Sequence, residues 1–117
     1  MFRQLNKLEP HDREILEALG ATLLKTGDLK DAEEAEQIFA NLLGSYAWRN
    51  FYHGHGIANA ALGKLDDALR DLTTAIELGY GKVDRKMLDT NEHPHLKRLE
   101  AERSDALKEL KSRISSA

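Results

Sequence analysis

The stretch that decides the fold is GATLLKTGDLKDA at residues 20–32, because it recurs as GIANAALGKLDDA at residues 56–68. At this offset of 36 residues, five of the thirteen aligned positions are identical: two glycines, a leucine, an aspartate and an alanine. Ordinary composition gives about one identity by chance over such a length. A fixed period is the signature of a repeat architecture, so the chain contains two related units.

The first unit is predicted to be a pair of helices. Pro10 suits the first turn of the first helix, and Gly27 supplies a left-handed stop after its last turn. Asp28 then caps the second helix, which is expected to end at Gly44. The apolar residues of the first helix recur at the spacing of one helix face: Ile15, Leu16, Leu19, Leu23 and Leu24.

The second unit follows the same plan. Ser45 is the expected cap of its first helix, which runs toward the turn at Gly63. Asp66 is the expected cap of its second helix, which is expected to end at Gly79. All four predicted helices thus have start and stop signals in the sequence.

Two glycines lie inside predicted helices, at Gly20 and Gly56. Each costs about 1 kcal/mol relative to alanine in a helix interior. Because they recur at the same phase, we interpret them as positions where a neighbouring helix comes too close for a Cβ atom. The small residues Ala32 and Ala68 are the expected facing partners.

This helix pair resembles the tetratricopeptide repeat. Counted from Arg13 and Arg49, each unit has small residues at positions eight and twenty and glycine at position fifteen: Gly20, Gly27 and Ala32, then Gly56, Gly63 and Ala68. The resemblance covers about residues 13–80 and implies an all-α fold in which two helix-turn-helix repeats stack as a short right-handed solenoid. The chain departs from the family pattern at several positions where the family has a large apolar or aromatic residue. Its offset of 36 residues also exceeds the family's usual period of about 34. The two added residues are expected near Gly44.

The C-terminal segment matches neither repeat and is predicted to cap the stack. A stack of helix pairs leaves its last apolar face bare and needs such a cap. One helix begun by Pro94 is expected, with a single apolar stripe: Leu96, Leu99, Ala106, Leu107, Leu110 and Ile114. The chain then forms one domain, residues 1–117, divided into repeat 1 (10–44), repeat 2 (45–80), a connector (81–93) and the capping helix (94–115).

Composition excludes several classes of protein. The chain is 41% hydrophobic and 32% charged, has no cysteine and carries a net charge of −3, which argues against disulfide frameworks and thiolate chemistry. Its amino terminus has no apolar stretch typical of a signal peptide, and no run approaches a membrane span, so a cytoplasmic protein without a membrane partner is expected. Residues 1–81 carry 8 Lys and Arg against 13 Asp and Glu, an acidic balance that argues against nucleic acid.

No metal site, cofactor or catalytic residue is predicted. His53 and His55 are two residues apart, so on a helix they point about 200° away from each other and cannot share an ion. His93 and His95 flank a proline and are interpreted as a solvated turn. The sequence also lacks nucleophile and phosphate-binding motifs.

Tyr52, His55 and Asn59 share one face of a predicted helix. Two interpretations are open. His55 and Asn59 can bond to each other or to nearby backbone, since unpaired and buried they would cost about 1–3 kcal/mol each. Alternatively, the face is open to a partner that supplies these bonds. The first interpretation is preferred.

The family resemblance implies a ligand groove lined by the first helix of each repeat. Carried onto this chain, its positions are Glu14, Glu17, Ala21, Leu24, Lys25, Asn50, His53, Ile57, Ala60 and Ala61. An acidic rim over small apolar residues suits a peptide or helix that carries Lys or Arg. The function expected is therefore a non-catalytic protein-interaction module or adaptor, a monomer or weak homodimer, that binds a basic segment of a partner protein on its concave face.

An alternative function is structural self-assembly. Short repeat stacks have exposed ends that can pair, and the predicted C-terminal helix has a nearly continuous apolar stripe. Arg103 interrupts that stripe, which favours an intramolecular cap.

Overall fold

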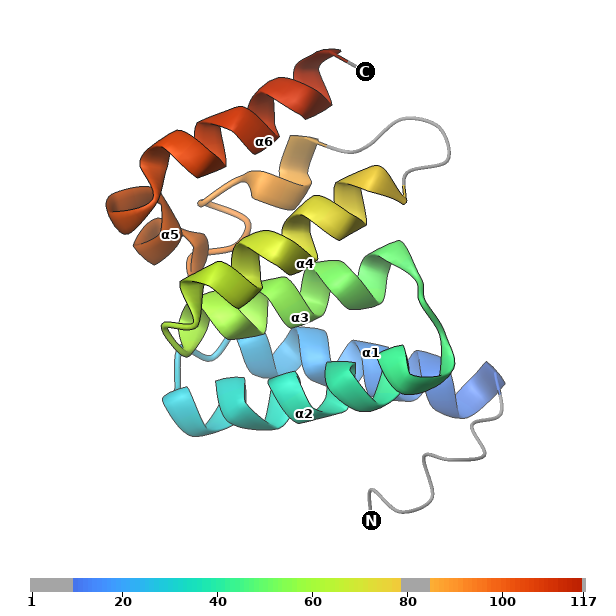
Figure 1. Cartoon of the computed structure of the whole chain (residues 1–117). Helices are drawn as coiled ribbons and strands as arrows, with labels where there is room; N and C mark the ends of the chain where they lie inside the picture. The colour runs from blue at the N-terminus through green and yellow to red at the C-terminus, as the bar shows by residue number, and fades with distance from the viewer. Residues whose placement is uncertain (1–9, 79–84, 117) are drawn as a thin grey trace.

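Four helices form two hairpins that lie side by side, and a C-terminal segment packs over the second one (Figure 1). The computed structural model describes residues 10–78 and 85–116, and within them it is all-helical. The first hairpin comprises α1 (Pro10–Leu24) and α2 (Leu29–Ser45), and the second comprises α3 (Arg49–Ala61) and α4 (Leu65–Glu77). A short 3-10 helix, η2 (Arg85–Leu88), precedes α5 (Leu96–Glu102) and α6 (Ser104–Ser116). The predicted all-α class and the two helix pairs are confirmed.

The turns inside the two hairpins follow the sequence signals closely. Gly27 and Gly63 have φ angles of 77° and 79°, in the left-handed region where glycine is favoured. Asp28 caps α2, because its side chain accepts a 2.8 Å hydrogen bond from the backbone N–H of Lys30. In the second hairpin the equivalent residue is Lys64, so the expected cap at Asp66 is wrong and Asp66 lies in the first turn of α4.

The connection between the hairpins differs from the expectation. Gly44 does not end α2 and Ser45 does not cap α3, because α2 continues to Ser45 and α3 begins after Trp48. Nothing lies within 4 Å of a Cβ placed on Gly44, so the helix passes through this exposed position without needing a stop there. With 17 residues against 13 in α4, α2 takes up the added length of the first unit. Gly79, the expected end of α4, lies outside the described residues.

The helix glycines mark close contacts, as predicted, but the nearest partner of one is not the expected residue. A Cβ on Gly56 would lie 3.0 Å from Leu72 and 3.3 Å from the backbone oxygen of Ala68. A Cβ on Gly20 would instead meet the ring of Phe39 at 2.7 Å, so the nearest partner of Gly20 is Phe39, and its pairing with Ala32 stays a prediction. Phe39 occupies this space because its ring fills the centre of the first hairpin, where it is 2% exposed.

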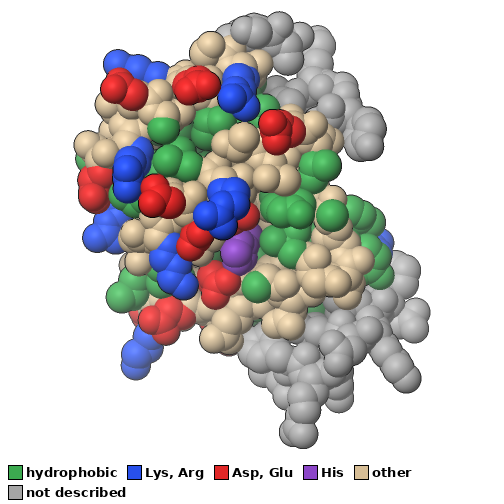
Figure 2. All heavy atoms as spheres, viewed as in Figure 1, with side chains coloured by type: hydrophobic (Ala, Val, Ile, Leu, Met, Phe, Trp, Pro, Cys, Tyr) green, Lys and Arg blue, Asp and Glu red, His purple; other side chains and the backbone are tan. Residues whose placement is uncertain are grey.

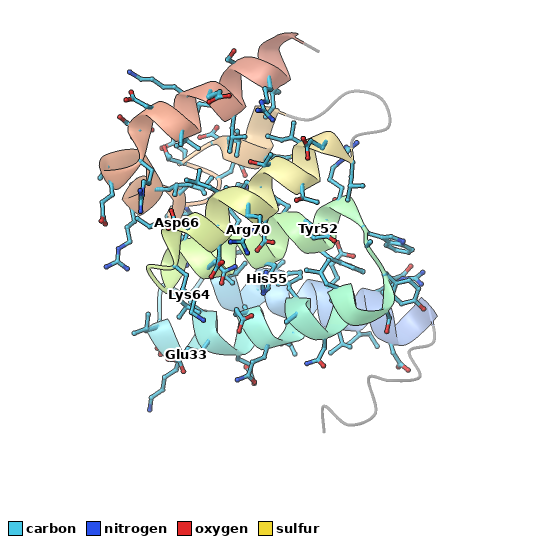
Figure 3. The ribbon with its side chains drawn as sticks, viewed as in Figure 1. Glu33, Tyr52, His55, Lys64, Asp66 and Arg70 are labelled. Carbon is cyan, nitrogen blue, oxygen red and sulfur yellow. The ribbon has the colours of Figure 1, made fainter. Side chains whose placement is uncertain are left out.

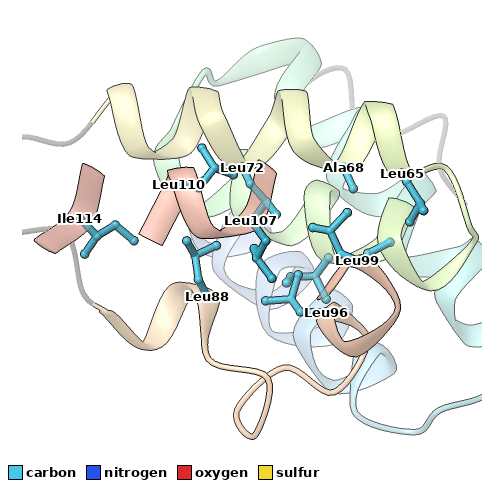
Figure 4. Packing of buried hydrophobic residues seen from close by; sticks show 11 residues of the cluster. Leu65, Ala68, Leu72, Leu88, Leu96, Leu99, Leu107, Leu110 and Ile114 are labelled. Atoms are coloured by element: carbon cyan, nitrogen blue, oxygen red, sulfur yellow. The ribbon is translucent and has the colours of Figure 1, made fainter. Parts of the chain in front are cut away.

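The C-terminal segment does cover the second hairpin, but not as one helix. The chain breaks at Arg103, where φ is −135° and ψ is 47°, and α5 and α6 lie on either side. The break costs few backbone bonds, because the Arg103 N–H still reaches Leu99 and its carbonyl accepts from Leu107. The break lets α5 pack on α3 while α6 packs on α4. Buried leucines and one isoleucine join the segment to α4 (Figure 4): Leu88, Leu96, Leu99, Leu107, Leu110 and Ile114.

The opposite end of the stack is less covered. Leu16, Leu23 and Leu24 of α1 pack against the core, whereas Ile15 and Leu19 are 52% and 43% exposed. The predicted apolar stripe of α1 is therefore divided between a packed part and a part that faces solvent.

Candidate functional site

A cavity of about 340 Å³, called the pocket below, lies between α1, α3 and the segment that leads into α5. Seven of the ten residues predicted for a ligand groove line it: Glu17, Ala21, Leu24, Lys25, Asn50, His53 and Ile57. They come together because α1 and α3 are the first helices of the two hairpins and contact each other directly. Whether they bind a partner stays a prediction.

The other three predicted residues lie elsewhere. Glu14 is exposed on α1, away from the pocket. Ala60 is completely buried in the core, where the C-terminal segment covers α3, and it therefore cannot contact a partner in this structure. Ala61 is partly buried near the end of α3 and is likewise not part of the pocket lining.

Residues that the sequence pattern did not indicate complete the lining. Phe39 and Gly54 form part of its floor, and residues 92–95 form a wall opposite α1. A Cβ on Gly54 would overlap the Phe39 ring, so a glycine is required where the ring passes beneath α3. The repeat gave no signal for this contact, because the residue equivalent to Gly54 in the first unit is Ala18, and no periodic pattern pointed to residues 92–95.

Two histidines attach the C-terminal segment to the pocket. Nε2 of His53 lies 2.7 Å from the carbonyl oxygen of Met87, and Nε2 of His95 lies 2.9 Å from that of Leu24, the last residue of α1. A carbonyl oxygen only accepts, so each of these nitrogens donates a proton. The His95 bond satisfies one of the carbonyls that a helix end leaves unpaired. The ring of His93 also packs edge-on against that of His53, with centroids 4.7 Å apart.

The pocket is mildly acidic at neutral pH. The pKa of His53 is lowered to about 4, mainly because burial disfavours the charged ring; the bond to Met87 opposes this, and the nearby His93 adds to it. His53 is therefore neutral near pH 7. Glu17 and Glu92 then provide two negative charges at the lining, against one positive charge from Lys25.

The opposite face of α3 carries a second polar group, the His55 cluster, formed by Glu36, His55, Asn59 and Asp71. Nδ1 of His55 lies 2.6 Å from Asp71, and its Nε2 lies 2.6 Å from Glu36. Asn59 is 2% exposed and donates a 2.9 Å bond to Asp71. Figure 3 labels His55 and Tyr52 on this face, and Figure 2 shows, in the same view, a histidine side chain at the surface among acidic and basic side chains.

The preferred interpretation of this face is confirmed in part. Asn59 Nδ2 and His55 Nδ1 do lie 3.3 Å apart, but both point at the same oxygen of Asp71. The main partners are thus two carboxylates on other helices rather than nearby backbone. Burial lowers the pKa of His55, but the hydrogen bonds to Asp71 and Glu36, together with their charges, outweigh it and raise the pKa above 6.5.

Neither the pocket nor the His55 cluster has the arrangement of a metal centre. Across residues 10–78 and 85–116, no group of three or more histidine, aspartate and glutamate side chains is placed to hold a metal ion. His53 and His55 point to opposite faces of α3, as the sequence predicts.

Comparison with protein-family models, with curated proteins and with solved structures finds no match to this chain. The resemblance to the tetratricopeptide repeat therefore depends on the internal repeat and its spacing. In the part of the chain that the structure describes, no helix is both long enough and apolar enough to cross a membrane.

Proposed function

We propose that this chain is a non-catalytic protein-interaction module, built like two tetratricopeptide repeats in a right-handed stack, that binds an extended segment of a partner protein. The observation that carries the proposal is the pocket, where the first helices of both hairpins converge on one cavity. Its floor is apolar and its edges carry charged and amide groups, the usual character of a specific binding site: Ala21, Leu24, Phe39, Gly54 and Ile57 below, with Glu17, Lys25, Asn50 and Glu92 around them.

The size of the pocket favours an extended peptide over a helix. An α-helix with its side chains is about 10–12 Å across, whereas a cavity of about 340 Å³ is at the small end of the range for ligand pockets and admits side chains rather than a whole helix. Residues 92–95 also narrow the concave side that a helix would need. We therefore propose an anchoring side chain as the occupant, with the flanking peptide lying across α1 and α3.

Charge favours lysine or arginine as the anchor. Two carboxylates face one ammonium group at the pocket, and His53 is neutral. The long apolar stem of such a side chain packs on the floor while its charged end reaches Glu17 or Glu92. Because residues 1–81 are acidic overall, we propose a basic protein partner and no role for nucleic acid. The proposal also keeps the cytoplasmic location expected from the sequence.

Selection from a displayed random-peptide library tests this proposal. Peptides enriched on the wild-type protein are expected to share a basic residue, and their Kd is measured by fluorescence anisotropy. Ala21→Phe fills the pocket from an exposed position and should weaken binding about tenfold or more. Ala40→Phe is the matched control, an exposed alanine outside the pocket lining. Equal affinity for both variants, or no enriched peptide, would overturn the proposal.

A second pair of variants separates pocket charge from total charge. Glu17→Lys reverses a charge at the pocket, whereas Glu14→Lys makes the same change on α1 away from it. Only the first should abolish the preference for a basic anchor. If both weaken binding equally, the preference comes from the overall charge of the protein and the pocket assignment fails.

One observation favours self-assembly as an alternative function. Ile15 and Leu19 are four residues apart on one face of α1 and are both about half exposed. The C-terminal helix is a poorer candidate, because its apolar residues are buried against the second hairpin. Sedimentation equilibrium decides this: a mass of 13.2 kDa at all concentrations removes the alternative, and a dimer that Ile15→Lys dissociates supports it.

A further inference from the structure

The His55 cluster joins three helices through a single ring. Glu36 belongs to α2 in the first hairpin, Asp71 belongs to α4, and His55 lies on α3 between them. The side chains of all three are largely buried, with exposed fractions of 23%, 14% and 18% for Glu36, Asp71 and His55. Solvent still reaches the ring, so a proton can exchange there.

The geometry favours a charged ring. A neutral imidazole has one N–H donor and one lone pair, whereas an imidazolium has two donors. Both ring nitrogens lie 2.6 Å from carboxylate oxygens, which only accept. If the ring were neutral, one nitrogen lone pair would face a carboxylate oxygen at this distance. Two charge-assisted bonds form only when His55 carries two protons.

The charged groups that face the ring come from α2 and α4. Glu36 from α2 and Asp71 from α4 face the ring, while Asn59 donates to Asp71 from α3 itself. Of the cations that Figure 3 labels on this face, Arg70 pairs with Asp67 at 3.3 Å, and Lys64 stands at the start of α4. Loss of the proton therefore leaves two partly buried carboxylates without the cation between them.

Helices α2 and α3, which the contact between Glu36 and His55 joins, also meet beneath the pocket. Glu36 lies one helical turn before Phe39 on α2, and His55 follows Gly54 on α3. The pair Glu36 and His55 and the pair Phe39 and Gly54 are thus neighbouring contacts between α2 and α3. The His55 contact and the Phe39 contact therefore hold the same two helices together, about one helical turn apart on α2.

We propose that His55 is a proton-controlled joint between the two hairpins: protonated, it ties Glu36 to Asp71 and holds α2 against α3 under the pocket, and deprotonated, it releases this contact. The raised pKa of His55 agrees with this geometry. The joint is independent of the proposed function, because it concerns the packing of the hairpins whether or not a peptide binds.

NMR of the wild-type chain tests the proton on His55. Its ring ¹⁵N shifts should show two protonated nitrogens at pH 6.5, and the titration midpoint should lie above 6.5. Glu36→Gln should lower that midpoint. Glu33→Gln is the control, because it removes an exposed carboxylate one turn earlier on the same helix and should leave the midpoint in place. A midpoint at or below 6.5, or an equal effect of both variants, would overturn the proposal.

A second measurement follows the contact between the hairpins. The ring protons of Phe39 and the methyl group of Ala21 should shift with the His55 midpoint in the wild type. In His55→Gln, which keeps a hydrogen-bonding side chain but cannot titrate, this transition should vanish. Should that variant not fold, Glu36→Gln serves instead and should move the Phe39 transition together with the His55 midpoint. Phe39 signals that ignore the His55 titration would refute the joint.

Discussion

His53 and His55 lie two residues apart on α3, but their rings contact different kinds of group on opposite faces of the helix. His53 donates to the backbone carbonyl of Met87 in η2, while both ring nitrogens of His55 contact carboxylates on the other face of the helix. Because successive residues turn by about 100°, the two rings have different surroundings despite their proximity in sequence. Their pKa values therefore move in opposite directions, down for His53 and up for His55.

Acid is expected to destabilise the protein through His53. Its pKa is about 4 in the folded chain and 6.5 when unperturbed, so the unfolded chain binds more protons between these values. Stability from this residue is complete above pH 6.5 and is lost as the pH falls toward 4, by up to about 3 kcal/mol. Urea unfolding of the wild type and of His53→Gln from pH 7 to 4 measures the difference. If the two curves stay parallel, this account of acid sensitivity is wrong.

Asp71→Asn should cost about 1–3 kcal/mol in the free energy of unfolding, because the acceptor that His55 and Asn59 share loses its negative charge. The loss should be larger at pH 6 than at pH 9: the raised pKa of His55 means that its stabilisation is complete below 6.5 and disappears as the pH rises through the folded value. Asp67→Asn, at a half-exposed carboxylate on the same helix, should change stability by less than about 0.5 kcal/mol. A pH-independent loss for Asp71→Asn would contradict the charged ring.

Gly54→Ala should destabilise the protein by about 1–3 kcal/mol, because the added methyl group meets the fully packed Phe39 ring. Gly44→Ala is the matched control in α2, where no atom lies within 4 Å of the new methyl group. That control should be neutral or stabilising by up to about 1 kcal/mol. Thermal unfolding of the two variants measures both effects. A stable Gly54→Ala protein would show that α2 and α3 are not held at this separation.

His95→Ala removes the hydrogen bond from Nε2 of His95 to the Leu24 carbonyl, which ties the segment before α5 to the end of α1. We expect a loss of about 1 kcal/mol and faster amide hydrogen exchange in residues 91–97. Exchange in α4 should stay unchanged, since the core under α6 is untouched. If exchange rises throughout the chain instead, the effect of this hydrogen bond is not local and the prediction is wrong.

The hairpins and most of the pocket lining could be predicted because they depend on local signals. The family resemblance, carried onto α1 and α3, named Glu17, Ala21 and His53 as groove residues, and the repeated glycines Gly27 and Gly63 marked the turns. Prediction failed where a position only looked like a stop, as at Gly44, which the helix passes through because nothing near it forces an end.

The remaining features depend on contacts between residues distant in sequence. Glu36 and Asp71 lie 19 and 16 residues from His55, and their offsets within the repeats do not correspond, so the period gave no indication of the cluster. His95 meets Leu24 across 71 residues, from a segment without periodicity. The break at Arg103 likewise accompanies contacts of the C-terminal segment with both α3 and α4.

The bond between His95 and Leu24 also bears on how the chain unfolds and evolves. In an open array of helix pairs, each pair contacts only its neighbours, so an end can fray while the rest stays folded. Here the C-terminal segment packs on the second hairpin and reaches back to the first. We therefore expect that loss of the C-terminal segment weakens the first hairpin as well as the second. For the same reason, a third helix pair could not be inserted before the C-terminal segment without separating His95 from α1, so this arrangement admits two repeats beneath its cap.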